Sequence, residues 1–276
     1  MSNSRAPFPP LPRLGSGTWR MGERRGARAS EVAALRLALD LGMDLIDTAE
    51  MYGEGGAEEV VGEAIGGRRS DVVLVSKFYP HHAAPRQLRA ACGASLRRLG
   101  VDSVDLYLLH WRGSVPLGET VHALEELVEE GRIRRWGVSN FDVADMEDLF
   151  RVPGGSRCAA NQVLFNLARR GIEFDLLPWC RERGIDVMAY SPLDEGRLVG
   201  HPALAAVAAR LGAPESQVAL AWTLREPGEV SLPKASRLEH VRSNHAALAL
   251  RLDVSVLAEL DVAFPPPARK RALEMI

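Results

Sequence analysis

The chain has 276 residues, of which 46% are hydrophobic, enough for a large buried core. Lysine and arginine together number 34 and aspartate and glutamate 36, which gives a formal net charge of −2. A charge so close to zero argues against a protein drawn to nucleic acid or to an anionic membrane.

Cysteine usage and the absence of long apolar segments indicate the compartment. Cys92, Cys158 and Cys180 form no C-x-x-C pair, which is typical of a reducing environment and not of a disulfide framework or a structural zinc site. No window approaches the length of a membrane span, and the first 14 residues lack the apolar core of a signal peptide. We therefore expect a cytoplasmic protein with no membrane or nucleic-acid partner.

In chain order, short runs of β-forming residues alternate with longer helical patterns. Strands are predicted near residues 14–19, 44–47, 72–77, 104–109, 132–138, 158–163, 185–189 and 229–232. Helices are predicted at 30–41, with Ser30 as N-cap, and at 57–65, 85–99, 118–130, 143–150, 174–183, 202–211, 215–224 and 238–248. Residues 1–13 and the proline-rich, basic residues 265–276 are expected to be extended ends.

Counting the opening segment, these patterns make eight strand–helix units, the number that closes a parallel barrel. A doubly wound open sheet is the rival, but it should show a glycine-rich dinucleotide motif after an early strand. The segment Gly15-Ser16-Gly17-Thr18-Trp19-Arg20 lacks the third glycine of that motif. We therefore predict an α/β protein, a (β/α)8 TIM barrel whose single domain covers residues 1–276.

Four polar residues, Asp47, Tyr52, Lys77 and His110, lie at or just beyond the predicted C-terminal ends of strands. In a parallel barrel these ends open onto one face, which carries the catalytic residues. A phenol has an ordinary pKa of about 10. The Lys77 ammonium would lower it, Asp47 would keep Lys77 charged, and His110 would orient a carbonyl group. Singly, each residue suits a structural role, but together they favour a site for carbonyl reduction.

The same residues stand in motifs that resemble the aldo-keto reductase family. The matching blocks are Asp47-Thr48-Ala49-x-x-Tyr52-Gly53, Val75-Ser76-Lys77, Leu108-Leu109-His110-Trp111, Gly17-Thr18-Trp19, Gly137-Val138-Ser139-Asn140-Phe141, Asn161-Gln162, Ala189-Tyr190-Ser191-Pro192-Leu193 and Pro233-Lys234. They run in order from about Gly15 to Asn244, followed by a short tail of bacterial type. The resemblance implies an NADPH-dependent oxidoreductase that reduces aldehydes and ketones to alcohols by hydride transfer, with Tyr52 as general acid and no metal.

The resemblance also implies where the cofactor binds. Ser139, Asn140 and Gln162 match positions that bind the nicotinamide carboxamide, and Tyr190 matches the residue that stacks on the nicotinamide ring. The segment 191–197 would lie over the pyrophosphate, and residues after the predicted strand at 229–232 would hold the adenosine phosphate. The complete implied set is Gly17, Thr18, Trp19, Asp47, Ser139, Asn140, Gln162, Tyr190, Ser191, Pro192, Leu193, Lys234, Ser236, Arg237, His240 and Asn244.

The block after Lys234 departs most from the family pattern. His240 stands where an arginine is usual, and Ser243 stands where a glutamate is usual. Ser236 and Arg237 are placed to grip a 2′-phosphate at a helix start, where backbone N–H groups favour an anion. We therefore expect NADPH as the cofactor, with NADH possible.

The substrate side is expected to be lined by Trp19, Tyr52, His110 and Trp111. A short tail would leave this pocket comparatively open, so we expect activity on small aldehydes, dicarbonyls or aromatic ketones. The expected partner is thus a small carbonyl compound, and the family's common form is a monomer.

Two alternatives remain open at this stage. The first is an NADP(H)-binding regulatory or sensor protein of the same fold with little turnover, although the four residues of the site are all present. The second is a barrel lyase or isomerase that uses Lys77 in a Schiff base, a role that needs a lysine with a lowered pKa.

Overall fold

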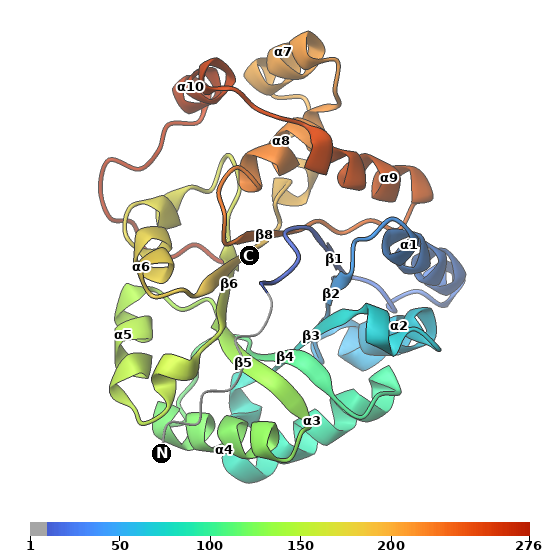
Figure 1. The fold of residues 1–276 in the computed structure, drawn as a ribbon, viewed down its shortest axis with the longest axis vertical. Helices are drawn as coiled ribbons and strands as arrows, with labels where there is room; N and C mark the ends of the chain where they lie inside the picture. Colours follow the sequence, from blue (N-terminus) through green and yellow to red (C-terminus); the bar gives the residue numbers. More distant parts are fainter. Residues whose placement is uncertain (1–9) are drawn as a thin grey trace.

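Eight parallel strands form one sheet in the computed structural model, which describes residues 10–276; the first nine residues of the predicted N-terminal extension lie outside it. The strands pair in chain order and are β1 (Gly15–Gly17), β2 (Leu45–Asp47), β3 (Val73–Phe78), β4 (Val104–Leu109), β5 (Ile133–Ser139), β6 (Ala160–Leu164), β7 (Asp186–Tyr190) and β8 (Glu229–Leu232). Parallel bridges from Leu14 to Ser231 and from Gly17 to Lys234 close the ring. The predicted (β/α)8 barrel is confirmed (Figure 1).

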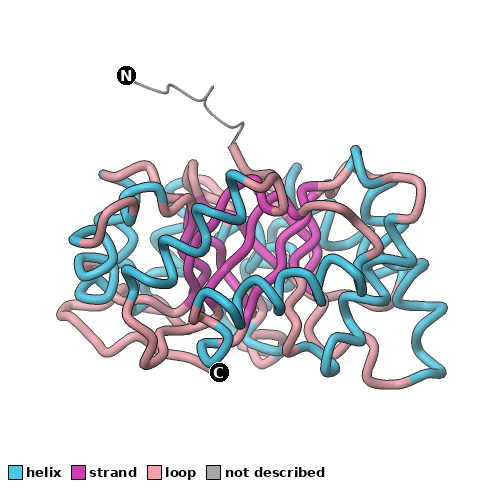
Figure 2. Tube along the Cα trace, turned by 90° about the horizontal axis from the view of Figure 1, so that it is seen from below, coloured by secondary structure: helices cyan, strands magenta, loops and turns pink. Residues whose placement is uncertain are grey.

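Helices surround the strands on all sides (Figure 2). They are α1 (Arg28–Asp40), α2 (Gly56–Ile65), α3 (Pro85–Leu99), α4 (Leu117–Glu129), α5 (Val143–Arg151), α6 (Leu176–Glu182), α7 (Pro202–Leu211), α8 (Glu215–Thr223), α9 (Leu238–Ala246) and α10 (Val254–Ala263). The strands are apolar on both faces because one face packs on this helical layer and the other fills the barrel.

The barrel interior is a packed core, as expected for eight strands. Its buried side chains come from alternate strand positions and are Leu45, Val75, Leu106, Leu108, Ala160, Met188, Val230 and Leu232. Leu11, which precedes β1, joins this cluster at 6% exposure. The polar residues at the C-terminal ends of the strands are therefore held by a rigid frame.

Two element predictions were wrong. Helix α1 begins at Arg28, and Ser30 is not its N-cap; the Ser30 hydroxyl instead donates to the Ala27 carbonyl at 2.8 Å. No helix was predicted after residue 248, yet α10 covers residues 254–263. Its sequence gave one signal that was overlooked: Asp253 accepts a hydrogen bond from the Val256 N–H, as an N-cap does.

Residues 265–276, which follow α10, contain no helix or strand but pack back onto the barrel. The side chain of Leu273 packs against the core, and Lys270 and Glu274 form ion pairs with other segments. The C-terminus lies beside β6 and β8 in Figure 1 and at one end of the barrel in Figure 2. The tail therefore covers part of a face that the sequence led us to expect open.

Candidate active site

Lys77 is at the centre of the four residues proposed for catalysis. Its Nζ donates to Asp47 Oδ2 at 2.8 Å, to the Thr48 carbonyl at 2.9 Å and to the Tyr52 hydroxyl at 3.1 Å. The Lys77 side chain is fully buried, at 0% exposure. It lies near the C-terminal end of β3, at the carboxyl face of the barrel and beside the end of β2. The His110 ring completes the group, with its centroid 5.8 Å from that of Tyr52.

The pKa values in this cluster show which effect dominates. Burial raises the pKa of Tyr52, and the Lys77 ammonium, which acts in the expected direction, does not overcome it. Burial lowers the pKa of Lys77, but the Asp47 carboxylate and Tyr52 outweigh burial, so the net pKa is raised. A lysine kept charged in this way is unsuited to Schiff-base chemistry, which counts against the lyase alternative.

His110 is neutral at physiological pH. Burial, with a smaller contribution from the Lys77 charge, lowers its pKa to about 3. Its backbone is fixed from both sides, because its N–H donates to the Phe78 carbonyl and its carbonyl accepts from the Asn140 amide. A neutral imidazole can donate one hydrogen bond without bringing a charge into the site.

The residues proposed to bind a carboxamide come together next to this group. β5 and β6 place Ser139 opposite Gln162, and the Gln162 amide donates to Asp47 Oδ1 at 2.8 Å. The Asn140 amide donates to Ser139 Oγ, and the Tyr190 hydroxyl donates to Asn140 Oδ1 at 3.0 Å. Buried hydroxyl and amide groups thus gather at one strand edge, the donor and acceptor set that a carboxamide needs.

Gly17, Thr18 and Trp19 border the same edge. The Thr18 hydroxyl donates to the Asp47 carbonyl at 2.9 Å, and Trp19 is partly buried, with the Arg20 guanidinium 4.4 Å from its ring centroid. These contacts place the loop after β1 beside Asp47.

Several loops on this face have left-handed backbone at residues other than glycine. They include Asn140 at φ 60°, Ser191 at φ 49° and Asp194 at φ 48°. Asparagine tolerates this conformation, but a serine there is uncommon and such strain concentrates at functional sites. Ser191, Pro192 and Leu193 form the start of this loop, and the Ser191 carbonyl accepts from the Asn166 amide at 2.9 Å.

A cluster of positive charge lies at the end of β8. The Lys234 side chain is exposed; desolvation lowers its pKa, Glu31 opposes that effect, and the guanidinium groups of Arg24 and Arg20 add to it. Cations that destabilise one another in this way favour a bound anion. Arg20 and Arg24 were not predicted as site residues, because nothing in the local sequence after Gly17-Thr18-Trp19 shows that their charges act on Lys234.

The remaining residues of the adenosine-phosphate block differ in how they are placed. Arg237 is the N-cap residue of α9 and pairs with Glu239 at 3.3 Å, both side chains being 68% exposed. Ser236 is partly buried, His240 is exposed and Asn244 is buried at 5%. Ser243, where the family has a glutamate, accepts a hydrogen bond from Gln217.

Aromatic groups surround the substrate side. Trp111 lies with its ring centroid 5.0 Å from His110 and 6.0 Å from Tyr79. The loop carrying Tyr79 is held by Glu50, whose Oε1 accepts from the Tyr79 N–H at 2.6 Å and contacts His82 Nδ1 at 2.8 Å. Sequence reasoning missed Glu50, although it lies between Asp47 and Tyr52.

The C-terminal residue also reaches this site. Burial raises the pKa of Tyr190 to about 12, and the nearby backbone of Ile276 is a smaller effect that lowers it. Sequence reasoning did not find this contact, because nothing local links residue 276 to β7.

Comparison with known proteins identifies the family to which the chain belongs. The family model described as "Aldo/keto reductase family" matches residues 13–263. The chain belongs to the aldo/keto reductase family. It is 52% identical to a protein named methylglyoxal reductase YeaE from Escherichia coli K12, over 96% of this chain and 95% of that protein.

Solved aldo/keto reductases superpose closely. The structure of one from Klebsiella pneumoniae, in complex with NADP and acetate, has a TM-score of 0.95 at 53% identity and covers 96% of both chains. The thermostable aldo-keto reductase Tm1743, in complex with the inhibitor epalrestat, has a TM-score of 0.85 at 38% identity and covers 91% of this chain and 95% of that chain. The expected family and enzyme class, a nicotinamide-dependent oxidoreductase, are confirmed.

Proposed function

We propose that this aldo/keto reductase uses NADPH to reduce small aldehydes and ketones, above all 2-oxoaldehydes such as methylglyoxal, with Tyr52 as the general acid. NADPH-dependent carbonyl reduction is supported by the family and by relatives solved with NADP or NADPH. The observation that carries the catalytic assignment is the pair of contacts from Lys77 Nζ to Asp47 Oδ2 and to the Tyr52 hydroxyl.

Proton delivery follows from that geometry. The raised pKa keeps the Tyr52 phenol protonated at neutral pH, so it has a proton to give to a carbonyl oxygen. Lys77, fixed by Asp47, stabilises the phenolate that remains, and neutral His110 can donate a second hydrogen bond to the same oxygen. Bound NADPH supplies the hydride to the carbonyl carbon. The two electrons of the C=O π bond pass to oxygen, which takes the Tyr52 proton and becomes an alcohol.

The residues present fit the cofactor. Ser139, Asn140 and Gln162 would hold the carboxamide, and Tyr190 would lie along the ring, beside the hydrogen-bonded groups at the ends of β5 and β6. The mutually repelling Lys234, Arg20 and Arg24 suit a phosphate-bearing ligand. Ser236, Arg237, His240 and Asn244 would complete the adenosine end.

The substrate proposal rests on a relative and on the pocket. Methylglyoxal is the substrate in the name of the Escherichia coli protein that is 52% identical to this chain. Trp19, Trp111, Tyr52 and His110 would line the pocket, with Tyr79 and the end of the tail at its edge. A small dicarbonyl needs little room beyond the reacting group.

The chain is proposed to act as a cytoplasmic monomer. Cys92, Cys158 and Cys180 are all free and buried, in accord with a reducing compartment. No helix in residues 10–276 is long and apolar enough to cross a membrane.

The test is NADPH consumption with nitrobenzaldehyde, methylglyoxal and a diketone, measured for the wild type beside Tyr52→Phe. Turnover should fall by about 10²–10⁴-fold in the variant, the usual contribution of a positioned acid. NADPH binding, followed by fluorescence, should persist. Activity that survives in Tyr52→Phe would refute the assignment of the acid, and tight NADPH binding without turnover in either protein would favour the sensor alternative.

A further inference from the structure

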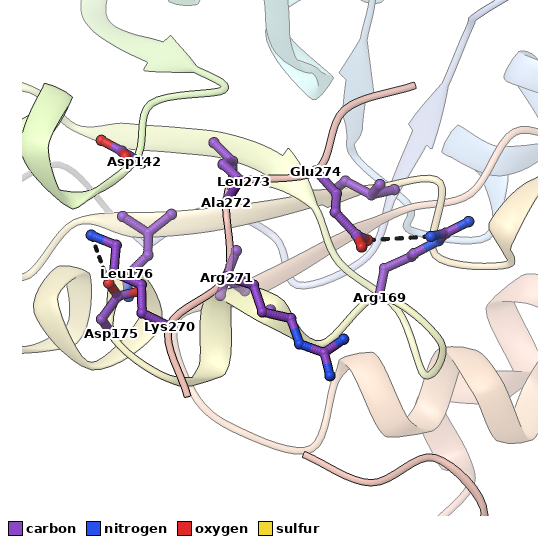
Figure 3. A pocket seen from close by; sticks show the side chains of 12 residues that line it. Asp142, Arg169, Asp175, Leu176, Lys270, Arg271, Ala272, Leu273 and Glu274 are labelled. Atoms are coloured by element: carbon purple, nitrogen blue, oxygen red, sulfur yellow. Dashed lines mark hydrogen bonds and ion pairs between the residues drawn. The ribbon is translucent and has the colours of Figure 1, made fainter. Parts of the chain in front are cut away.

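The C-terminal strap, defined as residues 265–276, is fastened by two ion pairs to the segment between β6 and α6. Lys270 Nζ lies 3.2 Å from Asp175 Oδ2, and Glu274 Oε2 lies 3.4 Å from Arg169 Nη1. Figure 3 shows both pairs, with the strap running across this segment and a small cleft between them. Leu273 packs against the core between the two pairs.

Arg169 also contacts the loop on its other side. Its Nε lies 3.5 Å from Oδ1 of Asp194, which is buried and accepts two further hydrogen bonds from Arg197. Asp194 belongs to residues 191–197, called here the cofactor loop because the family resemblance places it over the pyrophosphate. One guanidinium therefore touches the strap and the cofactor loop together.

The backbone around Arg169 is fixed independently of these contacts. The Arg169 N–H and the Ala168 N–H both donate to Asn166 Oδ1, and the Asn166 amide donates to the Ser191 carbonyl at the start of the cofactor loop. Arg169 is thus held in place between the strap, which has no helix or strand, and the short 3-10 helix Asp194–Gly196 of the cofactor loop.

The far end of the strap meets the same site. The backbone of Ile276 lies close enough to the hydroxyl of Tyr190, which directly precedes the cofactor loop, to affect its pKa. Opening the strap would therefore uncover Tyr190, and it would take away one of the two carboxylates that Arg169 contacts.

We propose that Arg169 is a positioning residue that couples the C-terminal strap to the cofactor loop. With Glu274 in place, Arg169 is oriented toward Asp194 and favours the closed loop; with the loop closed, Arg169 is oriented toward Glu274 and favours the closed strap. Linkage is reciprocal, so the factor by which strap closure tightens the binding of a ligand to the closed loop equals the factor by which that ligand favours the closed strap. The coupling rests on the proposed cofactor role of the loop.

Trypsin gives a readout that does not depend on catalysis. The strap offers cleavage sites at the exposed Arg269, Lys270 and Arg271, and cleavage after them releases residues 270–276, 271–276 or 272–276. When opening is fast, the cleavage rate follows the population of the open strap. Cleavage is followed by intact-mass spectrometry, with and without NADPH, while fluorescence titration gives the NADPH Kd of each protein.

The variants separate the two contacts. Without NADPH, trypsin should cleave Glu274→Gln about fivefold faster than the wild type. This factor is at the low end of the range usual for coupling between sites. NADPH should slow cleavage of the wild type by a similar factor, but it should not protect Arg169→Gln. Arg169→Gln should also weaken NADPH binding by about fivefold, whereas Arg169→Lys, which keeps the charge, should recover part of both effects. Arg28→Gln, which removes two exposed ion pairs between α1 and α2, should match wild type.

The contrary results are distinct. Equal cleavage rates for Glu274→Gln and wild type would show that the Glu274–Arg169 ion pair does not hold the strap closed. Equal protection by NADPH in Arg169→Gln and wild type would refute the coupling, as would NADPH binding to the wild type with no change in cleavage. Failure of the wild type to bind NADPH would refute the cofactor site and the coupling with it. The comparison of Glu274→Gln with wild type without NADPH would still show whether the Glu274–Arg169 ion pair holds the strap closed.

Discussion

The ammonium of Lys77 lies 3.1 Å from the Tyr52 phenol oxygen and is fully buried. Lys77→Met should therefore raise the Tyr52 pKa further, because burial and the Asp47 carboxylate both act in that direction once the ammonium is gone. Reduction should slow by about 10²–10⁴-fold. The pH profile for alcohol oxidation, which needs the phenolate, should move to higher pH.

The same substitution should also destabilise the fold. Asp47 would keep its hydrogen bond from Gln162 but would become a buried charge without its cation, a loss of about 3–5 kcal/mol in the free energy of unfolding. Denaturant unfolding of Lys77→Met and wild type measures this loss. An unchanged oxidation profile in a folded Lys77→Met protein would show that Lys77 does not tune Tyr52.

Cofactor choice should depend on Lys234 more than on Arg237. Replacing both with alanine should raise the KM for NADPH far more than the KM for NADH, since a lost charged contact to phosphate costs about 1.5–3 kcal/mol, or about tenfold or more. Both side chains are exposed, but the charges of Arg24 and Arg20 act on Lys234, whereas Arg237 is already paired with Glu239. The KM values of the single variants Lys234→Ala and Arg237→Ala show which of the two residues contributes more. Equal effects on the KM for NADPH and for NADH would contradict a 2′-phosphate role.

Much of this site was predictable because the signals are local. Strand runs end at Asp47, Lys77 and His110 in the sequence, and a parallel barrel brings all such ends to one face. Strand pairing then follows from the order of the strands, so Ser139 and Gln162 had to come close once β5 and β6 were neighbours. Periodicity and topology were sufficient for these residues.

Other parts of the site depend on contacts that no local pattern carries. Arg169 and Glu274 are 105 residues apart, and the strap could not be placed until α10 was known to turn the chain back. Helix α10 was missed because its residues are mostly apolar all round, with Val254 and Val262 exposed at 83% and 85%, so no amphipathic period stands out. The net pKa shift of Tyr52 depended on burial, which only the packed structure gives.

Glu50 should act on substrate binding through the loop that carries Tyr79. Glu50→Ala removes the acceptor for the Tyr79 N–H and for His82, and leaving such a buried donor unpaired costs about 1–3 kcal/mol. We expect a lower melting temperature and a raised KM for methylglyoxal, with NADPH affinity unchanged. His82→Ala, which leaves the Tyr79 contact intact, is the matched control and should have the smaller effect. A loss of NADPH affinity equal to the loss for substrate would contradict a role confined to this loop.

Acid should destabilise the protein through His110. The unfolded chain protonates this histidine near its ordinary pKa of about 6.5, whereas the folded protein, with a pKa of about 3, does not. The unfolded state therefore binds the extra proton between these values, and the free energy of unfolding falls as pH falls through that window. Between about pH 7.5 and about pH 5, the wild type should lose about 2 kcal/mol more than His110→Gln.

Glu229 titrates in the opposite sense, so its contribution to stability must be separated from that of His110. Burial raises its pKa to about 7, so its contribution to stability is lost as pH rises from the unfolded value toward 7, and acid restores it. Because the wild type and His110→Gln share Glu229, its contribution cancels in their difference. Denaturant unfolding of both proteins at the two pH values gives that difference directly. Parallel losses in the two proteins would mean that His110 is protonated as readily in the folded state as in the unfolded chain, and the neutral imidazole assigned to the site would be wrong.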